Sequence, residues 1–420
     1  MAQNKEQRRV CVIGGGPAGL MSAYACAMNG HVVTLFEKNE KLGKKIYITG
    51  KGRCNFTNDV SPSDFMPNIV RGEKFLRGAI YTFPPQKSIE FFERQGMPVK
   101  IERGNRAFPV SDHASDVTKA LEKACKNAGV QVHLNETVRE IKTENITVSD
   151  IGIMPRIVEL VTDKGNYPCD FVIVATGGLS YPTTGSTGDG YRFASQNGHT
   201  VTDLKTALCG LNLDGDYKEI QGLALKNVTL TVKLGQKVLY EEFGEALFTH
   251  FGISGPIVLS ASSVINRQPI AMLDIRLDLK PALDESTLDK RLLRDFDKYK
   301  NKRISNALVE LLPQKLIPFI LKQSGISLEK PVNAITKEER TRLVKSLKGF
   351  VIKARSLRGF EEAIVTSGGV TLAEVNPKTM ESKKVLGLKF CGEVLDVDAF
   401  TGGFNMQIAF STGFVAGNTI

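Results

Sequence analysis

The sequence lacks several features that mark particular classes of protein. It has no C-x-x-C pair, and its seven cysteines are scattered and odd in number, which argues against a disulfide framework and favours reduced thiols. The five histidines show no ligand spacing such as H-E-x-x-H, so we expect no metal site. No uninterrupted apolar run is long enough to span a membrane, and the polar start MAQNKEQRR does not resemble a signal peptide. These absences predict a cytoplasmic protein without a membrane partner.

The charge is basic overall and uneven along the chain. The 420 residues carry a net charge of +10, with 42% hydrophobic and 24% charged residues, as in ordinary globular proteins of two or three domains. Residues 281–360 hold 18 lysines and arginines against 9 acids, and so supply +9. Such a segment can attract nucleic acid or an anionic substrate. A solvated helical surface is the better interpretation, because these charges alternate with apolar residues at helical spacing, so nucleic acid is not the favoured partner.

Residues 10–37 read as a strand, a glycine turn, a helix and a second strand. Gly14, Gly16 and Gly19 form G-x-G-x-x-G, whose glycines allow a tight turn, the approach of a pyrophosphate and close packing of helix on strand. The helix N-terminus then faces the phosphates. Glu37 ends the second strand, where a carboxylate accepts hydrogen bonds from the hydroxyls of an unphosphorylated ribose. A tight turn without a ligand is the alternative, but the whole strand-helix-strand pattern favours nucleotide binding.

Glycine turns recur later in the chain. A strand predicted over 171–175 ends at the turn Ala175 to Gly178, the kind of strand end where open α/β sheets bind ligands. Residues 390–407 again follow the order of strand, acid, glycine turn and helix. In an FAD protein such an acid can hold the ribityl chain, and the helix N–H groups can face the flavin. This late element has no clear use in an NAD protein, so it favours FAD.

The remaining periodicities divide the chain into regions. Residues 38–59 read as a basic loop, residues 201–279 as a β-rich insertion, and residues 284–348 as helices broken by prolines. Further elements are expected as helices at 88–95, 116–129 and 188–199 and as strands at 130–134, 158–162 and 350–358. The expected domains are a nucleotide-binding domain at 1–198 and 359–420, a β-rich domain at 199–280 and 349–358, and a helical domain at 281–348.

Six motifs together point to a family. They are VIGGGPAGL, GKKIYITGKGRCNFTN, VATGGLSYPTTGSTGDGY, FTHFGISGP, TSGGV and GEVLDVDAFTGGFNMQIAFSTG. Through them the chain resembles, over essentially its full length, the bacterial FAD-binding flavoproteins grouped with aminoacetone oxidase and with the flavoprotein reductase of bile-acid dehydroxylation. The resemblance implies an α/β fold with a Rossmann-type FAD-binding domain like those of glutathione reductase and fumarate reductase. It also implies that this domain is built from both ends of the chain and is interrupted by a β-barrel-like domain and a small helical domain.

The resemblance further implies which residues bind FAD without a covalent bond. The expected contacts run from the pyrophosphate and ribose to the flavin end, although Lys51 and Phe404 depart from the family's usual side chains. The full set is Gly14, Gly16, Pro17, Ala18, Gly19, Glu37, Lys38, Lys44, Lys45, Gly50, Lys51, Gly52, Arg53, Cys54, Val138, Ala175, Thr176, Gly177, Gly178, Asp189, Gly392, Glu393, Gly403, Phe404, Asn405 and Gln407.

The residues leave the catalytic groups open. A flavin carries out the redox step itself, so no acid or base is obligatory. His250 is a candidate proton donor, but a lone histidine is more often structural. Cys54 is a candidate redox thiol, but no second cysteine lies near it in sequence, so packing is the simpler role. Tyr181 either borders the flavin or serves the turn before Pro182.

The leading hypothesis is an FAD-dependent oxidoreductase that acts on a small molecule. It would be either an amine-type oxidase that uses oxygen or an NAD(P)H-driven reductase of an enone. No second G-x-G-x-x-G follows a strand, so NAD(P)H is expected only as a transient reductant. The alternatives are an RNA-binding flavoenzyme that modifies tRNA through residues 281–360, and a flavin-binding protein without catalytic activity.

Overall fold

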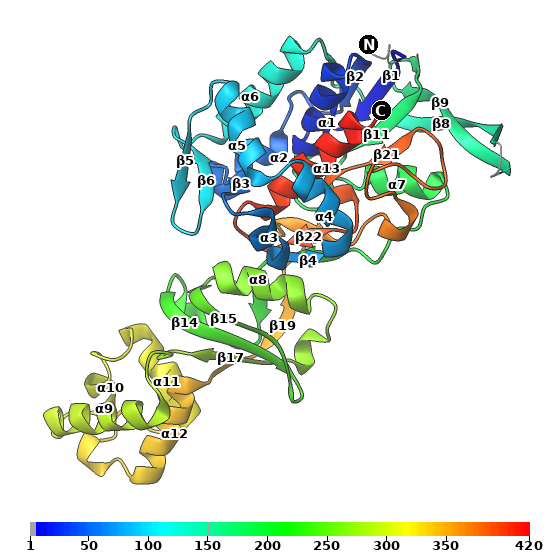
Figure 1. Ribbon diagram of the computed structural model, residues 1–420. Coiled ribbons are helices and arrows are strands. Elements are labelled where there is room, and N and C mark those ends of the chain that lie inside the picture. The colour runs from blue at the N-terminus through cyan, green and yellow to red at the C-terminus, as the bar shows by residue number, and fades with distance from the viewer. Residues whose placement is uncertain (1–5, 149–151) are drawn as a thin grey trace. The chain divides into compact units, whose positions relative to one another are not determined.

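The computed structural model describes residues 6–148 and 152–420, and of Lys51 it describes the backbone alone. The chain forms two compact units (Figure 1). Unit 1 consists of Met1–Thr206 and Phe360–Ile420, and unit 2 of Ala207–Gly359. Each unit has its own hydrophobic core. Unit 1 is therefore assembled from segments far apart in the sequence.

Unit 1 is organised around a parallel five-stranded sheet. Its strands lie in the order β21-β11-β1-β2-β7, and each neighbouring pair is parallel. They are β1 (Arg9–Ile13), β2 (Val32–Glu37), β7 (Gln131–Leu134), β11 (Phe171–Val174) and β21 (Leu388–Phe390). The strands expected at 10–13, 32–36, 130–134 and 171–175 are confirmed. Almost every residue of β1 and β11 is buried, which explains why these strands read as unbroken apolar runs.

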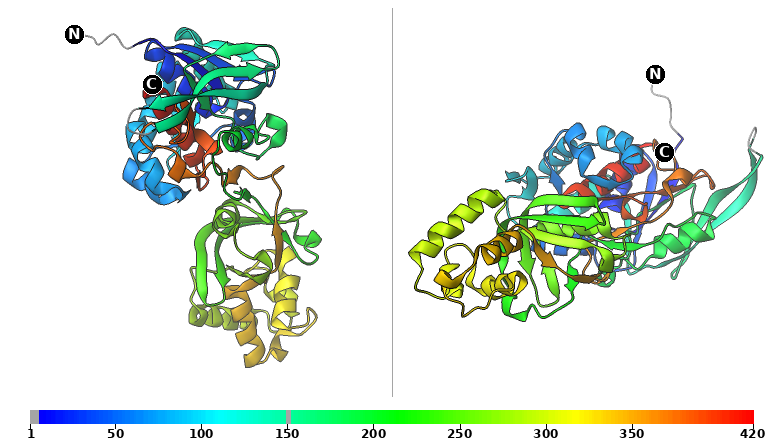
Figure 2. Two further views of the ribbon diagram at one scale, coloured as in Figure 1. Left: turned by 90° about the vertical axis from the view of Figure 1, so that its right-hand side faces the viewer. Right: turned by 90° about the horizontal axis from the view of Figure 1, so that it is seen from below.

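Helices and small sheets surround this central sheet. The helices of unit 1 are α1 (Pro17–Met28), α2 (Lys44–Ile48), α3 (Pro62–Phe65), α4 (Glu73–Thr82), α5 (Pro85–Arg94), α6 (Ala114–Asn127), α7 (Asp189–Gln196) and α13 (Phe404–Asn418). The small sheets are formed by β3 (Thr57–Asn58), β4 (Ile69–Arg71), β5 (Val99–Glu102), β6 (Arg106–Pro109), β8 (Val138–Val148), β9 (Gly152–Thr162), β10 (Asn166–Pro168), β12 (Lys205–Ala207), β20 (Val365–Ser367) and β22 (Asp398–Ala399). The hairpin of β8 and β9 projects from unit 1 (Figure 2).

The expectation of a loop over residues 38–59 is wrong in part. Helix α2 and the 3-10 turn η1 (Thr49–Gly52) lie inside this stretch. Gly43 precedes α2 with a φ of 66°, in the left-handed region that favours glycine. A five-residue helix completes little more than one turn, so it leaves no hydrophobic periodicity for the sequence to reveal.

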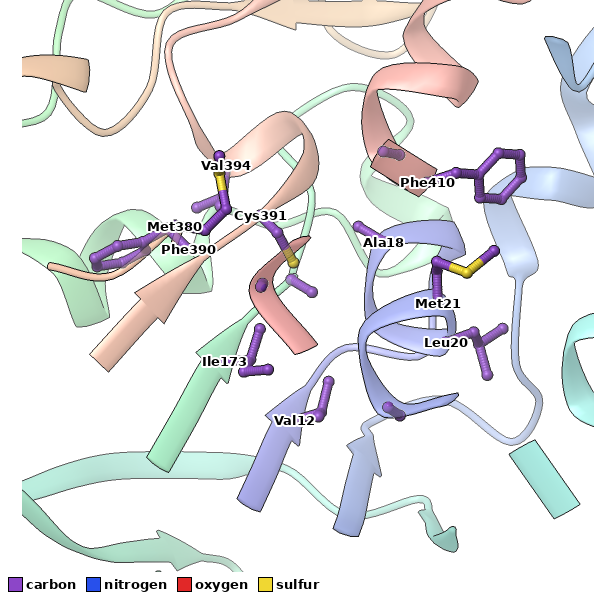
Figure 3. Packing of buried hydrophobic residues seen from close by; sticks show 14 of the residues in the cluster. Val12, Ala18, Leu20, Met21, Ile173, Met380, Phe390, Cys391, Val394 and Phe410 are labelled. Carbon is purple, nitrogen blue, oxygen red and sulfur yellow. The ribbon is translucent and has the colours of Figure 1, made fainter. Parts of the chain in front are cut away.

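Two helices from opposite ends of the chain pack on each other through glycines. A β-carbon at Gly413 of α13 would lie 2.4 Å from the carbonyl oxygen of Ala18 in α1, and one at Gly417 would lie 2.3 Å from that of Ser22. The two backbones can approach this closely only because these positions lack a β-carbon. Figure 3 shows side chains of β1, β11, α1 and α13 gathered in one core, with Phe410 on the side of α13.

Unit 2 combines an antiparallel sheet with helices. The sheet has the order β18-β17-β14-β15-β16-β13-β19, formed by β13 (Leu211–Leu213), β14 (Ala224–Leu234), β15 (Lys237–Phe248), β16 (Gly252–Ser254), β17 (Asp274–Asp278), β18 (Phe350–Ile352) and β19 (Ala354–Leu357). The helices are α8 (Pro256–Ile265), α9 (Glu285–Lys298), α10 (Ile304–Ala307), α11 (Ile317–Ser324) and α12 (Lys337–Lys348). No helix in the described parts of the chain is both long and apolar enough to cross a membrane.

One helix of unit 2 was not expected from the sequence. Helix α8 lies within the stretch 201–279, which alternation marked as β-rich. Seven of its ten residues are buried and its apolar residues lie on all sides, so it shows no amphipathic period that would separate it from a buried strand. Gly255 before the helix and Pro256 at its first position are the local signals of its start.

Candidate functional site

Three glycine turns meet at the carboxyl end of the parallel sheet. In the sheet register Ile13 lies opposite both Phe36 and Val174, and Val174 lies opposite Phe390. The backbone continues this contact past the strand ends, since Ala175 N donates to Ile13 O at 2.9 Å and Cys391 N donates to Val174 O at 3.1 Å. Open parallel sheets bind ligands at this edge. The turns near residues 14, 175 and 391 therefore form one candidate site in unit 1.

The glycines of the first turn have different surroundings. Gly14 has a φ of 103°, and a β-carbon there would lie 2.6 Å from Ala175 O. A β-carbon at Gly19 would lie 1.9 Å from Gly14 O. At Gly16, by contrast, a β-carbon would meet no described atom within 4 Å. Gly14 and Gly19 thus serve the packing of the turn, while Gly16 borders open space, as the position facing a pyrophosphate should.

The N-terminus of α1 is available to an anion. Gly16 is its N-cap and Pro17 follows, and among the described residues no side chain caps the helix. The first N–H groups of an uncapped helix attract negative charge, which suits a pyrophosphate. A β-carbon at Gly392 would lie 2.8 Å from the β-carbon of Ala18, in the first turn of this helix. The late glycine turn therefore lies against the first one.

Glu37 is fixed beside the same turn. Its side chain is buried, with Oε2 accepting a 2.8 Å hydrogen bond from Gly15 N. Its Oε1 accepts hydrogen bonds from the backbone N–H and the side-chain amide of Asn39, at 2.8 Å and 2.6 Å. The carboxylate is thus oriented before a ligand binds, at the strand end where the ribose is expected.

Lys38 and Asp189 come together although 150 residues separate them. Lys38 Nζ donates to Asp189 Oδ2 at 2.6 Å and to Thr187 Oγ1 at 2.5 Å. Burial by itself raises the pKa of Asp189, but the hydrogen bond and charge of Lys38 outweigh it and hold that pKa below its usual value. Lys44, at the start of α2, pairs instead with a residue just before this helix: its Nζ lies 3.2 Å from Glu40 Oε2.

Arg53 is engaged away from the glycine turns. Its guanidinium pairs with Glu102 and Asp112, and its centre lies 4.4 Å from the ring centroid of Phe108. Cys54 beside it is fully buried, and this burial raises the pKa of its thiol. A buried neutral thiol is a poor nucleophile, which fits the packing role.

Lys51 and Phe404 are the two positions expected to depart from the family pattern. The side chain of Lys51 lies outside the described residues, while its neighbours Gly50 and Gly52 have φ of 60° and 88°. Phe404 is buried and packs edge-on against Phe65, with ring centroids 5.0 Å apart. Phe404 therefore anchors the first turn of α13 to α3.

The polar residues at the start of α13 bond to the protein itself. Asn405 donates to Ala399 O at 2.7 Å and accepts from Ala399 N at 2.9 Å. Gln407 is fully buried and accepts a 2.6 Å hydrogen bond from Thr57 Oγ1. Gly403 is the N-cap of α13, and within the described chain no side chain caps it. The side chains of Asn405 and Gln407 thus fix the turn. The uncapped N–H groups at the start of α13 remain available to a ligand.

Glu393 has partners from two further segments. Lys45 Nζ donates to its Oε2 at 2.8 Å, and the backbone N–H of Thr366 donates to its Oε1 at 2.8 Å. Gly178 lies beside Thr366 and Glu393, since a β-carbon there would lie 2.4 Å from Thr366 Oγ1 and 3.0 Å from Glu393 Oε1. Thr366 was not among the expected site residues, although the motif TSGGV that contains it was a signal.

The remaining expected residues occupy several environments. Val138 begins β8 and is buried, Ala175 is buried, and Gly177 has a φ of 71°. His250 is exposed and lies in unit 2. Burial, with the nearby Glu362 carboxylate, raises the pKa of Tyr181, whose backbone φ is 53°.

The candidate site fits FAD. Besides the open space at Gly16 and the uncapped starts of α1 and α13, it contains polar atoms that the described chain leaves without a hydrogen-bond partner. These are the buried Oγ1 of Thr176, an expected contact, and the buried Oδ1 of Asn55, which directly follows the expected stretch Gly50 to Cys54. Buried polar atoms normally have a partner, so a bound polar ligand would account for both. The described residues include no cluster of three or more metal-ligating side chains.

Comparisons with known proteins identify the family of this chain. A family model described as the HI0933-like protein Rossmann domain matches residues 8–419. The chain is 32% identical over 416 residues to the 3-dehydro-bile acid delta(4,6)-reductase of Clostridium scindens, covering 97% of this chain and 98% of the relative. It is 31% identical over 413 residues to the ribosomal RNA dihydrouridine synthase of Haemophilus influenzae, covering 97% of each.

A solved structure supports the fold. The 3-ketosteroid-delta4-(5alpha)-dehydrogenase from Rhodococcus jostii RHA1 is 16% identical, with a TM-score of 0.52, and the match covers 100% of this chain and 98% of that one. At this identity the likeness concerns the fold alone. The Rossmann-type α/β class expected from the sequence is confirmed.

Proposed function

This chain belongs to the HI0933-like Rossmann-domain family and is an FAD-dependent oxidoreductase, and we propose that it reduces a carbon–carbon double bond conjugated to a carbonyl in a small molecule. The main support for this proposal is the 32% identity, along nearly the whole of both chains, to a relative named as a bile acid delta(4,6)-reductase. The dihydrouridine synthase relative is named for saturating a base, and the uracil double bond is likewise conjugated to a carbonyl. This shared chemistry favours enone reduction over amine oxidation.

The residues of unit 1 supply the binding functions that such a reaction needs. The start of α1 receives the pyrophosphate, Glu37 the adenosine ribose, and Glu393 the ribityl chain. When bound, FAD supplies the hydride chemistry. The N–H groups at the start of α13 favour negative charge at the flavin end. The other expected contacts stand as proposals, with Asn405 and Gln407 acting through the turn that they fix.

NAD(P)H is the proposed source of electrons. Without a second dinucleotide-binding pattern in the sequence, it would bind only while it transfers its hydride to FAD. The overall reaction would place a hydride on the β-carbon of the substrate and a proton on its α-carbon. The substrate gains two electrons and two hydrogens, and NAD(P)⁺ is released.

We also propose that residues 199–358 form two domains. Residues 199–280 with 349–358 would form the β-rich domain, and residues 281–348 the helical one. Helices α9 to α12 and the strands of the antiparallel sheet support this division, because they occupy those stretches in turn.

Anaerobic spectroscopy tests the proposal. NADH or NADPH should bleach the visible absorbance of the purified holoprotein, and a 3-oxo-Δ4,6 bile acid or a simple cyclic enone should restore it. The matching saturated ketone is the control and should leave the bleached spectrum unchanged. Bleaching by an amine, with peroxide formed in air and no response to nicotinamides, would establish the oxidase instead. If no flavin co-purifies and none can be reconstituted, the central claim fails.

A second candidate is reduction of a uridine in RNA. The ribosomal RNA relative and the charge of +9 over residues 281–360 favour it. Lys322 of α11 and Lys345 of α12 are exposed, and replacing either by alanine should lower the salt dependence of RNA binding by about one unit of slope. Affinity for ribosomal RNA no greater than that of an unrelated basic protein at physiological salt would dispose of this candidate.

A further inference from the structure

The motif TSGGV, residues 366–370, forms a junction between segments of the candidate site. Thr366 is fully buried in β20. Its Oγ1 accepts hydrogen bonds from Leu179 N at 2.8 Å and Ser180 N at 3.2 Å, and lies 3.0 Å from Ser180 Oγ. Its backbone N–H donates to Glu393 Oε1 at 2.8 Å. One residue thus joins the turn after β11 to the acid after β21.

The glycines around this junction allow its close packing. A β-carbon at Gly178 would lie 2.4 Å from Thr366 Oγ1. One at Gly368 would lie 2.4 Å from Asp203 O, and one at Gly369 would lie 2.5 Å from Val394 O. Because these neighbours are backbone atoms or a buried hydroxyl, they have little room to move. β20 and the two glycines after it therefore pack closely against the neighbouring segments.

The junction orients the carboxylate of Glu393 before any ligand binds. Lys45 Nζ holds Oε2 and the Thr366 N–H holds Oε1, so the plane of the carboxylate is fixed by two chain segments. An ionised carboxylate has about four acceptor positions, which leaves capacity for a ligand's hydroxyl groups. Binding to a preoriented group avoids the entropy cost of ordering it.

We propose that Thr366 is a positioning residue for the cofactor, which holds Glu393 and the turn Ala175 to Ser180 in the geometry that retains FAD. This inference rests on the proposed role of Glu393 in FAD binding. Thr366 itself acts through its neighbours: its hydroxyl fixes the turn and its backbone fixes the acid. Loss of the hydroxyl would leave the buried N–H of Ser180 and the partly buried N–H of Leu179 unpaired and let the turn separate from β20.

The test measures the rate at which purified holoprotein releases FAD, followed by the gain of flavin fluorescence on dilution. Thr366→Val should release FAD at least about tenfold faster than the wild type, and Thr366→Ser, which keeps the hydroxyl, should stay within about threefold. Thr162→Val is the matched control. Thr162 Oγ1 also accepts from two backbone N–H groups, those of Lys164 and Gly165 at 3.0 Å each, in the turn after β9.

A double-mutant cycle tests whether the turn that the Thr366 hydroxyl holds and Glu393 retain FAD together. In a Glu393→Gln background, Thr366→Val should accelerate FAD release less than it does in the wild type. Equal acceleration by Thr366→Val and Thr162→Val, or no acceleration by either, would overturn the inference. Fully additive effects of Thr366→Val and Glu393→Gln would overturn the coupling to Glu393. A wild-type protein that neither carries nor takes up FAD would instead overturn the proposed function.

Discussion

Gly16 and Gly19 belong to one motif but perform opposite tasks. Gly19 is closed in by the carbonyl of Gly14, whereas Gly16 borders space that a ligand can fill. The backbone of Gly16, with φ of −82° and ψ of −175°, is also one that alanine adopts. The same substitution should therefore affect folding at one position and cofactor binding at the other.

We expect Gly16→Ala to leave the stability of the apoprotein within about 1 kcal/mol of the wild type. Its β-carbon would enter the space expected for the pyrophosphate, so FAD affinity should fall by roughly tenfold or more. Gly19→Ala should cost about 2 kcal/mol of stability, because its β-carbon has no room beside Gly14. Thermal unfolding without FAD, combined with FAD titration, separates the two effects. Unchanged FAD affinity in Gly16→Ala would contradict the assignment.

Glu374 is a half-buried acid outside the candidate site that ties distant segments together. It accepts hydrogen bonds from Thr200 N at 2.8 Å and Lys384 Nζ at 2.5 Å, and His199 Nδ1 lies 3.2 Å away. Burial alone raises the pKa of Glu374, but the hydrogen bonds from Lys384 and Thr200 outweigh it and lower that pKa to about 2. The ionised form is therefore stabilised in the folded protein.

This pKa predicts how the stability depends on pH. Because the folded pKa is lowered, the contribution of Glu374 is complete above its ordinary pKa near 4.5 and is lost as the pH falls towards 2. Wild type should exceed Glu374→Gln in unfolding free energy at pH 6, and the difference should shrink by about 1 kcal/mol at pH 3.5. Urea unfolding at both pH values measures it. A difference that does not change with pH would refute the assigned ionisation.

At this scale the sequence revealed backbone requirements better than side-chain partners. Gly14, Gly16 and Gly19 were identified because each role needs a missing β-carbon, which the sequence shows directly. The partners of Arg53 and Asn405 could not be identified, because a side chain's choice among nearby acceptors depends on how distant segments pack. Thr366 was missed for the same reason, since it joins residues 179 and 393.

Among the elements, α1 and α13 form the pair on which the site depends. Both begin in the site without a side-chain cap, and they touch through Gly413 and Gly417. The sequence predicted α1 from its glycine turn and α13 from its glycine-acid-helix order. The contact between them was not predictable from periodicity, because α13 is buried along most of its length and shows no polar face.

Substitution of one helix glycine should separate the two helices. Gly413→Ala would place a β-carbon 2.4 Å from Ala18 O, and should cost about 1–3 kcal/mol of stability and speed the release of FAD. Gly78→Ala in α4 is the control, because no described atom lies within 4 Å of its β-carbon. That variant should gain about 0.5–1 kcal/mol from helix propensity. Equal thermal shifts for both variants would contradict the close packing of α1 and α13.

For the whole molecule, the insertion of unit 2 is the dominant feature. The chain enters and leaves unit 2 through neighbouring strands: Leu211 of β13 lies opposite Leu357 of β19, and Arg358 N donates to Gly210 O at 3.0 Å. The change from mixed α/β to alternating periodicity near residue 201 indicated this insertion from the sequence. Single helices within it, such as α8, were less visible because their apolar residues are not confined to one side.

Excision of unit 2 should leave the cofactor site intact. In a variant with residues 207–359 replaced by a short Gly/Ser linker, all expected FAD contacts remain, because every one of them lies in unit 1. We expect this variant to bind FAD with an affinity within about tenfold of the full chain, measured by fluorescence titration. Residues 207–359 expressed alone are the control and should bind none. A folded excision variant without FAD affinity would mean that unit 2 contributes to the site.

The pairing of α1 with α13 has a consequence for biosynthesis. About 375 residues lie between the end of α1 and the start of α13. At a translation rate of about 5–20 residues per second, α1 waits roughly 20 to 75 s before its partner helix exists. During this interval the surface around Ala18 and Ser22 is uncovered and prone to wrong contacts. A nascent chain that stalls before residue 404 should therefore be a substrate for chaperones and should be unable to retain flavin.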